Sequence, residues 1–348
     1  MSSPAPILEV RDLKTHFPVR GGIWLRSVAT CKAVDGVSFQ LLPGETLGLV
    51  GESGCGKSTL GKTIVRLLAP TAGSIRFEGT DLATLGRKKL KPIRRHLQMI
   101  FQDPAESLNA RHTVGQILEE PFIIHGIGSA EERRASVDTL LDKVGLPRAA
   151  AHRYPFEFSG GQRQRIGIAR ALALQPRLII CDEPVSALDV SIQSQVLNLL
   201  LDLQREFHLS YLFITHNLAV VKHVSDRIAV MYLGRIVELA DAEGLYARPR
   251  HPYTRALIAA IPEPEPRATR PRFIGTGDLP SPINPPPGCP FHPRCPHATD
   301  LCRREPPPLR ETSSAAEPSH AVACHYDLLP AAIPSPLGAP QKQESRDT

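Results

Sequence analysis

The feature that most constrains the fold of this chain is a glycine-rich segment between a short apolar run and a helical pattern. Residues 51–58 read GESGCGKS and fit the pattern G-x-x-x-x-G-K-[ST] of a phosphate-binding loop. Such a loop turns backbone N–H groups inward around phosphate oxygens, and the helix after it points its positive end at the anion. Average residue usage gives a match by chance in roughly 1% of chains of this length. The segment therefore predicts a strand, a phosphate-binding loop and a helix, in that order.

Two side chains of this segment indicate what else the ligand carries. Lys57 brings a mobile positive charge to the β- and γ-phosphates of a nucleotide. The hydroxyl of Ser58 can ligate Mg²⁺, a cation that prefers oxygen ligands. We therefore expect a nucleoside triphosphate with Mg²⁺. The residues expected to contact it are Gly51, Ser53, Gly54, Cys55, Gly56, Lys57, Ser58 and Thr59.

A pair of acids follows an apolar run further along the chain. Residues 178–183 read LIICDE, and acids at the carboxyl edge of a parallel strand face the ligand crevice of such sheets. Successive strand side chains point in opposite directions, so the two acids are expected to do different work. Asp182 is placed to hold Mg²⁺, usually through water, and Glu183 to polarise an attacking water as a general base. Acids also cap strands and helices, so the acid pair alone does not indicate catalysis. It does so here because a phosphate-binding loop precedes it in the chain.

Apolar runs alternate with helical patterns through the first two thirds of the chain. Residues 177–184 and 211–216 are short runs that end in polar side chains, and residues 227–239 are typical of a hairpin with its turn near Gly234. Strands that alternate with helices predict an α/β fold, with a mostly parallel sheet covered by helices. Residues 103–170 are mainly helical, which predicts an inserted helical subdomain. We see no internal repeat, which predicts one nucleotide cassette.

Composition excludes several classes of protein. Hydrophobic residues make up 42% of the 348 residues and charged residues 22%, which excludes a disordered or fibrous chain. No run approaches 18 consecutive apolar residues and the N-terminus lacks a signal-peptide pattern, so we expect a cytoplasmic protein that does not span the bilayer. The formal net charge of +6 permits contact with an anionic membrane or nucleic acid and argues for neither.

The last part of the chain is different in composition. Of 34 prolines, 20 lie after residue 260, together with four of the seven cysteines. Proline fixes φ and removes a backbone donor, so this part is not expected to be mostly helix or sheet. A proline-rich segment with four thiols indicates a small irregular module held by something other than a large apolar core. Residues 331–348 are predicted to be a disordered tail.

The four cysteines of this part follow the pattern C-x5-C-x6-C-x21-C. They are Cys289, Cys295, Cys302 and Cys324. In the cytoplasm thiols stay reduced, so metal ligation is the alternative to a disulfide, and four thiolates fit Zn²⁺ or an iron–sulfur cluster. The short spacings of zinc knuckles are absent, and the longer gaps suit ligands around a larger object. Residues His292, His297 and His325 are nearby and could complete a zinc site, and free thiols are the remaining alternative.

Four further motifs resemble those of one family. Residues 158–162, FSGGQ, precede a helical run and resemble the signature motif of ABC transporter ATPases, with Phe158 where Leu is commoner. Gln102 in MIFQDP resembles the Q-loop, residues 186–189 (SALD) the D-loop, and His216 the switch histidine of that family. Asn217 stands where members often have Asp, a small departure outside the catalytic atoms.

The resemblance covers residues 7–325. Several segments indicate one subfamily of these ATPases. The segments VMYLGRIVE, HPYTRAL and PSPINPPPGCPFHPRCPHA resemble the ATPase subunits of bacterial oligopeptide/dipeptide importers, more closely the second of their two paired ATPases. This resemblance implies a P-loop NTPase of the ABC cassette type: a RecA-like core, a β-subdomain and the inserted helical subdomain. The implied domains are the ATP-binding domain over residues 1–240 and a small irregular Cys/Pro-rich C-terminal module over 241–330.

The family also implies how ATP is bound. Two cassettes pack head to tail, with ATP between the phosphate-binding loop of one and the signature of the other. The signature residues expected to face the partner's ATP are Ser159, Gly160, Gly161 and Gln162. Gln102 would ligate Mg²⁺ or the attacking water, and His216 would contact the γ-phosphate and position the water of Glu183. Phe17 is expected to stack on adenine, although packing within a β-subdomain would equally explain it.

Cofactors and partners are implied in the same way. Members with this tail resemble proteins that hold a [4Fe–4S] cluster, and the four cysteine positions match. The implied partners are a second ATPase subunit, a different paired chain or an identical copy, two transmembrane permease subunits and an extracytoplasmic peptide-binding protein, with no nucleic acid. The chain would then lie peripherally on the cytoplasmic face of the inner membrane and drive import by ATP hydrolysis.

Other functions remain open at this point. A related importer of nickel, glutathione or another small solute would share these motifs. A soluble ABC ATPase of translation or DNA repair usually carries tandem cassettes or a long coiled-coil insertion, and neither is visible. A small-molecule kinase would leave the signature motif and His216 unexplained. An exporter is disfavoured because no membrane domain is fused to the chain.

Overall fold

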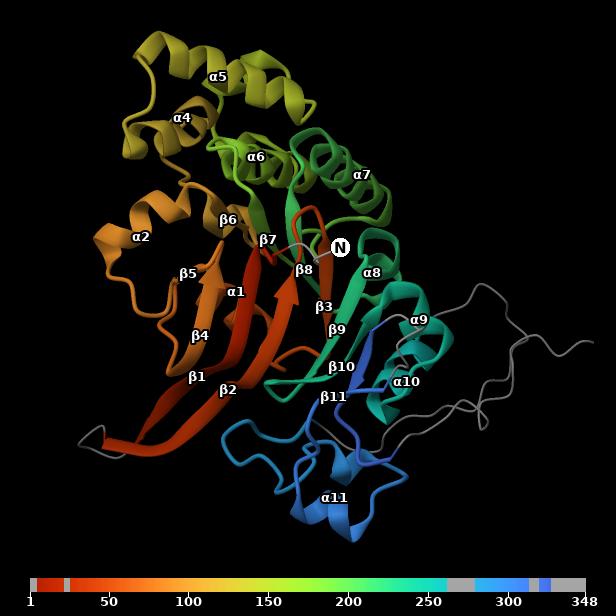
Figure 1. The fold of residues 1–348 in the computed structure, drawn as a ribbon. Coiled ribbons are helices and arrows are strands. Elements are labelled where there is room, and N and C mark those ends of the chain that lie inside the picture. The colour runs from red at the N-terminus through yellow and green to blue at the C-terminus, as the bar shows by residue number, and fades with distance from the viewer. Residues whose placement is uncertain (1–4, 22–25, 262–278, 313–318, 327–348) are drawn as a thin grey trace, which may run out of the picture.

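The computed structural model of the protein describes residues 5–21, 26–261, 279–312 and 319–326. Within these residues the chain forms two sheets with helices between and around them (Figure 1). The larger sheet contains, in spatial order, β11 (Arg310–Glu311), β12 (His320–Val322), β10 (Arg235–Asp241), β9 (Arg227–Tyr232), β3 (Thr46–Val50), β8 (Ser210–Thr215), β7 (Leu178–Asp182) and β6 (Leu97–Ile100).

The centre of the larger sheet is parallel, as the alternation of apolar runs and helices predicts. Strands β9, β3, β8, β7 and β6 run in one direction, so their carboxyl ends meet at one edge of the sheet. All residues of β3, β7 and β8 are buried, because helices cover both faces. Burial on both sides explains why these strands read as continuous apolar runs instead of alternating ones.

A second sheet packs on the other side of α1 (Lys57–Ile64). It is antiparallel, in the order β2 (Arg26–Leu41), β1 (Leu8–Gly21), β4 (Ala72–Phe77) and β5 (Thr80–Asp81). Leu60 and Ile64 of α1 are fully buried in the apolar cluster that joins the two sheets. This packing fixes the start of α1, and therefore the loop before it, against both sheets. β1 and β2 form a long antiparallel hairpin, paired from Leu8 opposite Leu41 to Gly21 opposite Arg26.

The region between β6 and β7 is mainly helical, as expected. It contains α3 (Pro104–Ser107), α4 (Val114–His125), α5 (Ala130–Lys143), the 3₁₀ turns η1 (Arg148–His152) and η2 (Pro155–Glu157), and α6 (Gly160–Leu172). Thr113 and Ser129 begin α4 and α5 with capping boxes, in which side chain and backbone satisfy each other's donors. α2 (Arg87–Arg94) precedes β6, and α7 (Val190–Phe207) and α8 (Leu218–Val224) follow β7 and β8.

The C-terminal part of the chain consists of short elements, and after residue 260 most described residues lie in neither helix nor strand, as the proline content predicts. After the β9–β10 hairpin, whose turn includes Gly234, come α9 (Ala242–Ala247), α10 (Pro252–Ala259), the 3₁₀ turn η3 (His292–Arg294) and α11 (Asp300–Arg304). β12 then pairs with β10 and extends the larger sheet. The blue segment around α11 lies at the end of the molecule opposite α4 and α5 (Figure 1). The predicted tail at residues 331–348 lies outside the described residues.

A buried carboxylate joins β12 to β10. Glu238 of β10 is fully buried and accepts a hydrogen bond of 2.7 Å from Nε2 of His320 in β12. It also accepts hydrogen bonds from the backbone amides of Arg250 and His251, at 2.6 and 2.9 Å. Several donors on one carboxylate offset the cost of its burial.

None of the helices in the described ranges combines the length and the apolar character that crossing a membrane requires.

Candidate active site

The phosphate-binding loop connects β3 to α1, where the sequence predicts it. Gly56, the residue before α1, has φ of +107°, and a Cβ atom there would lie 2.0 Å from the carbonyl oxygen of Ala33. Any other residue at this position would be strained and would collide with backbone, so only glycine fits. α1 begins without a side-chain cap, so no side chain occupies the amide groups of its first turn.

The side chain of Lys57 lies inside the loop and contacts its backbone. Its side chain is buried, and Nζ donates hydrogen bonds to the carbonyl oxygens of Gly51 at 2.8 Å and Glu52 at 3.0 Å. These contacts hold the ammonium group inside the curve of the loop. A charged donor at this point is able to move a short distance from carbonyl oxygens to a phosphate.

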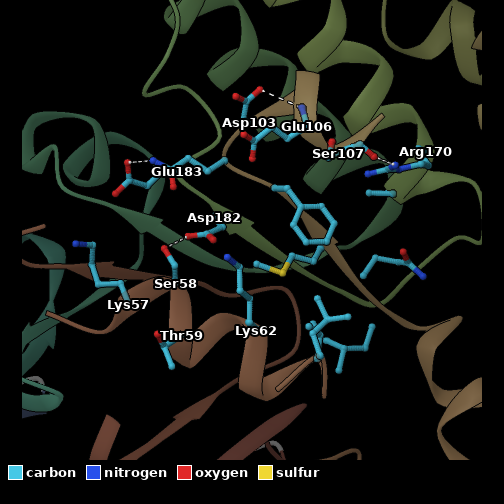
Figure 2. Close-up of a pocket in the computed structure, with 18 of the residues that line it drawn as sticks. Lys57, Ser58, Thr59, Lys62, Asp103, Glu106, Ser107, Arg170, Asp182 and Glu183 are labelled. Atoms are coloured by element: carbon cyan, nitrogen blue, oxygen red, sulfur yellow. Dashed lines mark hydrogen bonds between the residues drawn. The ribbon is translucent and has the colours of Figure 1, made fainter. Parts of the chain in front are cut away.

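Two side chains with oxygen atoms, Ser58 of the loop and Asp182, face each other. The hydroxyl of Ser58 donates a hydrogen bond of 2.7 Å to Oδ1 of Asp182, the last residue of β7 (Figure 2). Asp182 is almost completely buried, and this burial raises the pKa of its carboxyl group above the usual value. A hydroxyl and a carboxylate at hydrogen-bond distance are the kind of oxygen pair that Mg²⁺ takes as ligand or through water.

Glu183 accepts hydrogen bonds from both neighbouring strand ends. Nε2 of Gln102, just after β6, lies 3.3 Å from its Oε2, and Nδ1 of His216, just after β8, lies 3.1 Å from the same oxygen. The three side chains thus meet because parallel strands β6, β7 and β8 end at one edge of the sheet. A carboxylate held by two polar side chains in a cleft is suited to orient and deprotonate a water molecule.

The backbone at Glu183 differs from the sequence expectation. Glu183 was expected to continue the strand and point away from Asp182, but β7 ends at Asp182 and Glu183 has φ of +47°. The left-handed conformation is unfavourable for a residue with a side chain, at a cost of about 1–3 kcal/mol. Its amide donates a hydrogen bond of 2.9 Å to the carbonyl of Ile214, which anchors the turn. No pattern in the sequence signals this conformation.

The residues after these strands and around the loop line one cleft of about 1450 Å³. Of the residues that the sequence predicts for the site, those that line it are Ser53, Gly54, Gly56, Lys57, Ser58, Thr59, Gln102, Asp182, Glu183 and His216. Gly51 and Cys55 are buried within the loop and do not line the cleft.

The signature residues lie elsewhere on the chain. Ser159 caps α6 and accepts a hydrogen bond from the amide of Gln162 at 3.3 Å, while the Gln162 side chain accepts one from the amide of Ser159 at 3.0 Å. A Cβ on Gly161 would lie 2.5 Å from Ile192 in α7, so glycine allows the two helices to approach closely. Neither these residues nor Gly160 line the cleft. Within one chain the structure therefore does not bring the signature to the phosphate-binding loop.

Phe17 is not placed in the cleft either. It lies in β1 opposite Cys31 of β2, and 37% of its surface is exposed. It does not line the cleft, and stacking on adenine stays a prediction.

The four C-terminal cysteines line one small pocket of about 20 Å³. The amide of Cys289 donates a hydrogen bond of 2.8 Å to the carbonyl of Cys302. Burial raises the pKa of Cys289 to about 11 and also raises the pKa values of Cys295 and Cys324. Among the described residues, no group of three or more His, Cys, Asp or Glu side chains is spaced to hold a metal ion. The four cysteines thus line the same pocket, but their side chains do not form a metal site among the described residues.

The loop also contacts the C-terminal part of the chain, which the sequence does not indicate. Glu52 of the loop forms an ion pair with Arg294, 242 positions later, and its amide donates a hydrogen bond of 2.8 Å to the hydroxyl of Tyr253. Arg294 lies between Cys289 and Cys295. No local pattern in the sequence connects positions so far apart.

Comparisons with known proteins agree with this geometry. Residues 34–186 match the ABC transporter family and residues 237–302 the C-terminal region of oligopeptide/dipeptide transporters. The chain is 56% identical to the oligopeptide transport ATP-binding protein AppF of Bacillus subtilis (strain 168), over 92% of this chain and 97% of that protein.

Solved structures of ATP-binding cassettes share the fold. The cassette MJ0796, in a dimeric post-hydrolysis state with ADP and phosphate, is 28% identical, has a TM-score of 0.61, and is matched over 68% of this chain and 98% of its own. The protein cbiO1 of Clostridium perfringens, part of the transporter complex cbiONQ, is 26% identical with a TM-score of 0.60, over 70% of this chain and 91% of its own.

Proposed function

The chain belongs to the ATPases of the ABC transporter family, in the group that carries the oligopeptide/dipeptide transporter C-terminal region, and from this membership we propose that it powers the import of di- and oligopeptides. AppF, with which it shares 56% identity over nearly its whole length, is named as an oligopeptide transport protein. The C-terminal match separates this group from ATPases that have the cassette alone.

The proposed chemistry follows from the residues that meet in the cleft. Lys57 and the loop amides bind the β- and γ-phosphates of ATP, while Ser58 and Asp182 hold Mg²⁺ directly or through water. The observation that supports hydrolysis most strongly is the contact of Glu183 with both Gln102 and His216. Glu183 takes the proton of the attacking water, and its two partners fix its orientation toward the γ-phosphate.

A second ATPase subunit completes the proposed site. The signature residues, from Ser159 to Gln162, lie at the start of α6 and outside this chain's own cleft, with Ser159 and Gln162 exposed. A helix start with glycines is suited to contact a phosphate from outside. In the proposed head-to-tail pair, this chain's signature contacts ATP on the partner, a different paired ATPase. The dimeric state of the similar cassette MJ0796 supports this arrangement.

The proposal extends to the assembly and its place in the cell. Two transmembrane permease subunits carry the solute, and an extracytoplasmic peptide-binding protein delivers it. The chain would lie on the cytoplasmic face of the inner membrane. Within its nucleotide site, Phe17 would stack on the adenine of ATP. Import of nickel, glutathione or another small solute is the alternative, since the cleft of this chain contacts ATP and not the solute.

Replacement of AppF in Bacillus subtilis tests the import function. In a strain without AppF, we expect this chain to restore uptake of a radiolabelled oligopeptide, because 56% identity extends over 97% of AppF. The Lys57→Ala variant serves as the matched negative control. Recovery of the chain with the permease subunits, without any peptide uptake, would contradict peptide import and leave ATP binding unaffected.

We also propose that the cysteine pocket holds an iron–sulfur cluster. The chemistry of the donors supports this, since Cys289, Cys295, Cys302 and Cys324 line one pocket and thiolates are the ligands that such clusters take, but the described thiols are not spaced around a metal ion. When bound, the cluster would supply cross-links between segments of the chain that are far apart in sequence. Zinc with His292, His297 or His325 in place of a thiolate is the alternative, because these side chains line the same pocket.

Anaerobic purification tests the cluster. We expect brown protein with absorbance at about 400 nm and close to four iron atoms per chain, as Cys-bound [4Fe–4S] requires. The Cys295→Ser variant should lose most of this iron, whereas Cys31→Ser, which changes a cysteine in β2, should keep it. Colourless protein with one equivalent of zinc would favour zinc, and metal-free anaerobic protein would contradict both.

A further inference from the structure

The cysteine-containing segment of the chain holds the phosphate-binding loop from outside. Arg294 donates hydrogen bonds from Nη1 and Nη2 to the two carboxylate oxygens of Glu52, at 2.9 Å each. Glu52 is the second residue of the loop, and Arg294 ends η3, the turn between Cys289 and Cys295. A guanidinium group that binds a carboxylate through two parallel hydrogen bonds fixes its orientation as well as its position.

An aromatic cluster holds this pair in place. The Arg294 side chain is only 13% exposed, and its guanidinium lies 5.9 Å from the ring centres of both Tyr232 and Phe291. The ring of Tyr253 contacts both of these rings, and its hydroxyl accepts a hydrogen bond from the Glu52 amide. Glu52 is therefore fixed twice by the C-terminal part of the chain, at its carboxylate and at its backbone.

The same loop residue is in contact with Lys57. Nζ of Lys57 donates to the carbonyl of Glu52 at 3.0 Å, on the inner side of the loop. Neither Glu52 nor Arg294 lines the cleft, whereas the next loop residues, Ser53 and Gly54, do. Glu52 thus lies between Arg294 outside the loop and Lys57 inside it.

We propose that Arg294 is a positioning residue for nucleotide binding, which acts through Glu52 and links the cysteine-containing segment to the phosphate-binding loop. The proposal rests on the nucleotide site of the proposed function. Arg294 orients the loop that binds the phosphates and does not itself reach the ligand. Linkage between two sites is reciprocal, so nucleotide on the loop must in turn stabilise the arrangement of residues 289–295.

Binding measurements on the full-length chain test this role. With MgADP as the probe, we expect Arg294→Ala and Glu52→Ala each to raise Kd about tenfold, which corresponds to about 1.4 kcal/mol. Each variant removes the same interaction, the ion pair of Glu52 with Arg294. The double variant should therefore bind MgADP no more weakly than either single variant. Arg294→Lys should be intermediate, since an ammonium group cannot form the paired contact. KM for ATP should rise by the same factor, with kcat changed less than about threefold.

The control is Arg304→Ala, which removes an exposed arginine whose Nε contacts the carbonyl of Asp300 in its own helix. Its Kd should equal that of the unaltered chain. A normal Kd in Arg294→Ala, or fully additive effects in the double variant, would overturn the proposal. Should Arg294→Ala fail to fold, Glu52→Gln tests the pair from the loop side. Absence of binding in the unaltered chain would instead contradict the nucleotide site itself.

Hydrogen exchange gives a readout that a purely structural role would not change. Several backbone amides of residues 289–295 are protected from exchange by hydrogen bonds, among them those of Cys289, His292 and Arg294. Saturating MgADP should slow exchange in a peptide that spans residues 288–296 of the unaltered chain. In Glu52→Gln at saturating MgADP, this slowing should be lost. No effect of nucleotide in the unaltered chain would refute the linkage.

Discussion

Replacement of Glu183 by Gln is expected to reduce ATP hydrolysis by about 10²–10⁴-fold, the usual contribution of a general base. The amide keeps the shape of the carboxylate and its contacts with Gln102 and His216 but cannot take a proton from water. Nucleotide binding depends on other residues and should remain. With hydrolysis blocked, the ATP-bound pair of cassettes has no route to open, so a closed dimer should accumulate.

Phosphate release at saturating MgATP measures the first effect. Size-exclusion chromatography of the chain, alone and mixed with its paired ATPase, with and without ATP, measures the second. Glu131→Gln, an exposed change at the start of α5, is the matched control and should leave the rate unchanged. If Glu183→Gln hydrolyses ATP at a normal rate, Glu183 is not the base and another group must activate the water.

Replacement of Lys57 by Ala is expected to weaken nucleotide binding by about 100-fold, since a hydrogen bond to a charged group contributes roughly 1.5–3 kcal/mol. Lys57 is a cation buried within the loop, where its contacts with the carbonyls of Gly51 and Glu52 place it. Alanine removes the charge that would face the β- and γ-phosphates. Calorimetric titration with MgADP measures the loss.

Lys89→Ala, an exposed change in α2, removes the same charge away from the cleft and should bind as the unaltered chain does. Thermal unfolding of both variants without nucleotide separates loss of a ligand contact from loss of the fold. Unchanged affinity in Lys57→Ala would show that the loop binds phosphate without this lysine, and would remove the role assigned to it.

Much of the fold could be predicted because its strands have strong local signals. Residues 47–50, 178–181 and 211–214 contain only apolar residues and glycine, and polar residues at the carboxyl edge of the sheet follow each run within two positions. The loop at residues 51–58 could also be predicted, since its glycines and Lys57 meet local backbone and charge requirements. These features depend on neighbours in the sequence, and the structure agrees with them.

Other features depend on distant parts of the chain and had no local signal. The left-handed backbone of Glu183 is held by a hydrogen bond to Ile214 on the next strand. The pair of Glu52 and Arg294 needs the C-terminal segment folded back on the loop. The three residues of β12 are too few to show a strand pattern, and a strand was not expected among so many prolines. Tertiary packing decides all three.

The pairing of β12 with β10 has a consequence for shortened forms of this protein. A chain cut after α10 would keep every residue of the cleft but would expose the unpaired backbone of β10 as a new sheet edge, a template for intermolecular strand addition. It would also leave Glu238 without the imidazole donor of His320, in a place built to exclude water. We therefore expect the shortened chain to aggregate more readily than the full-length one, although the residues removed lie outside the cleft.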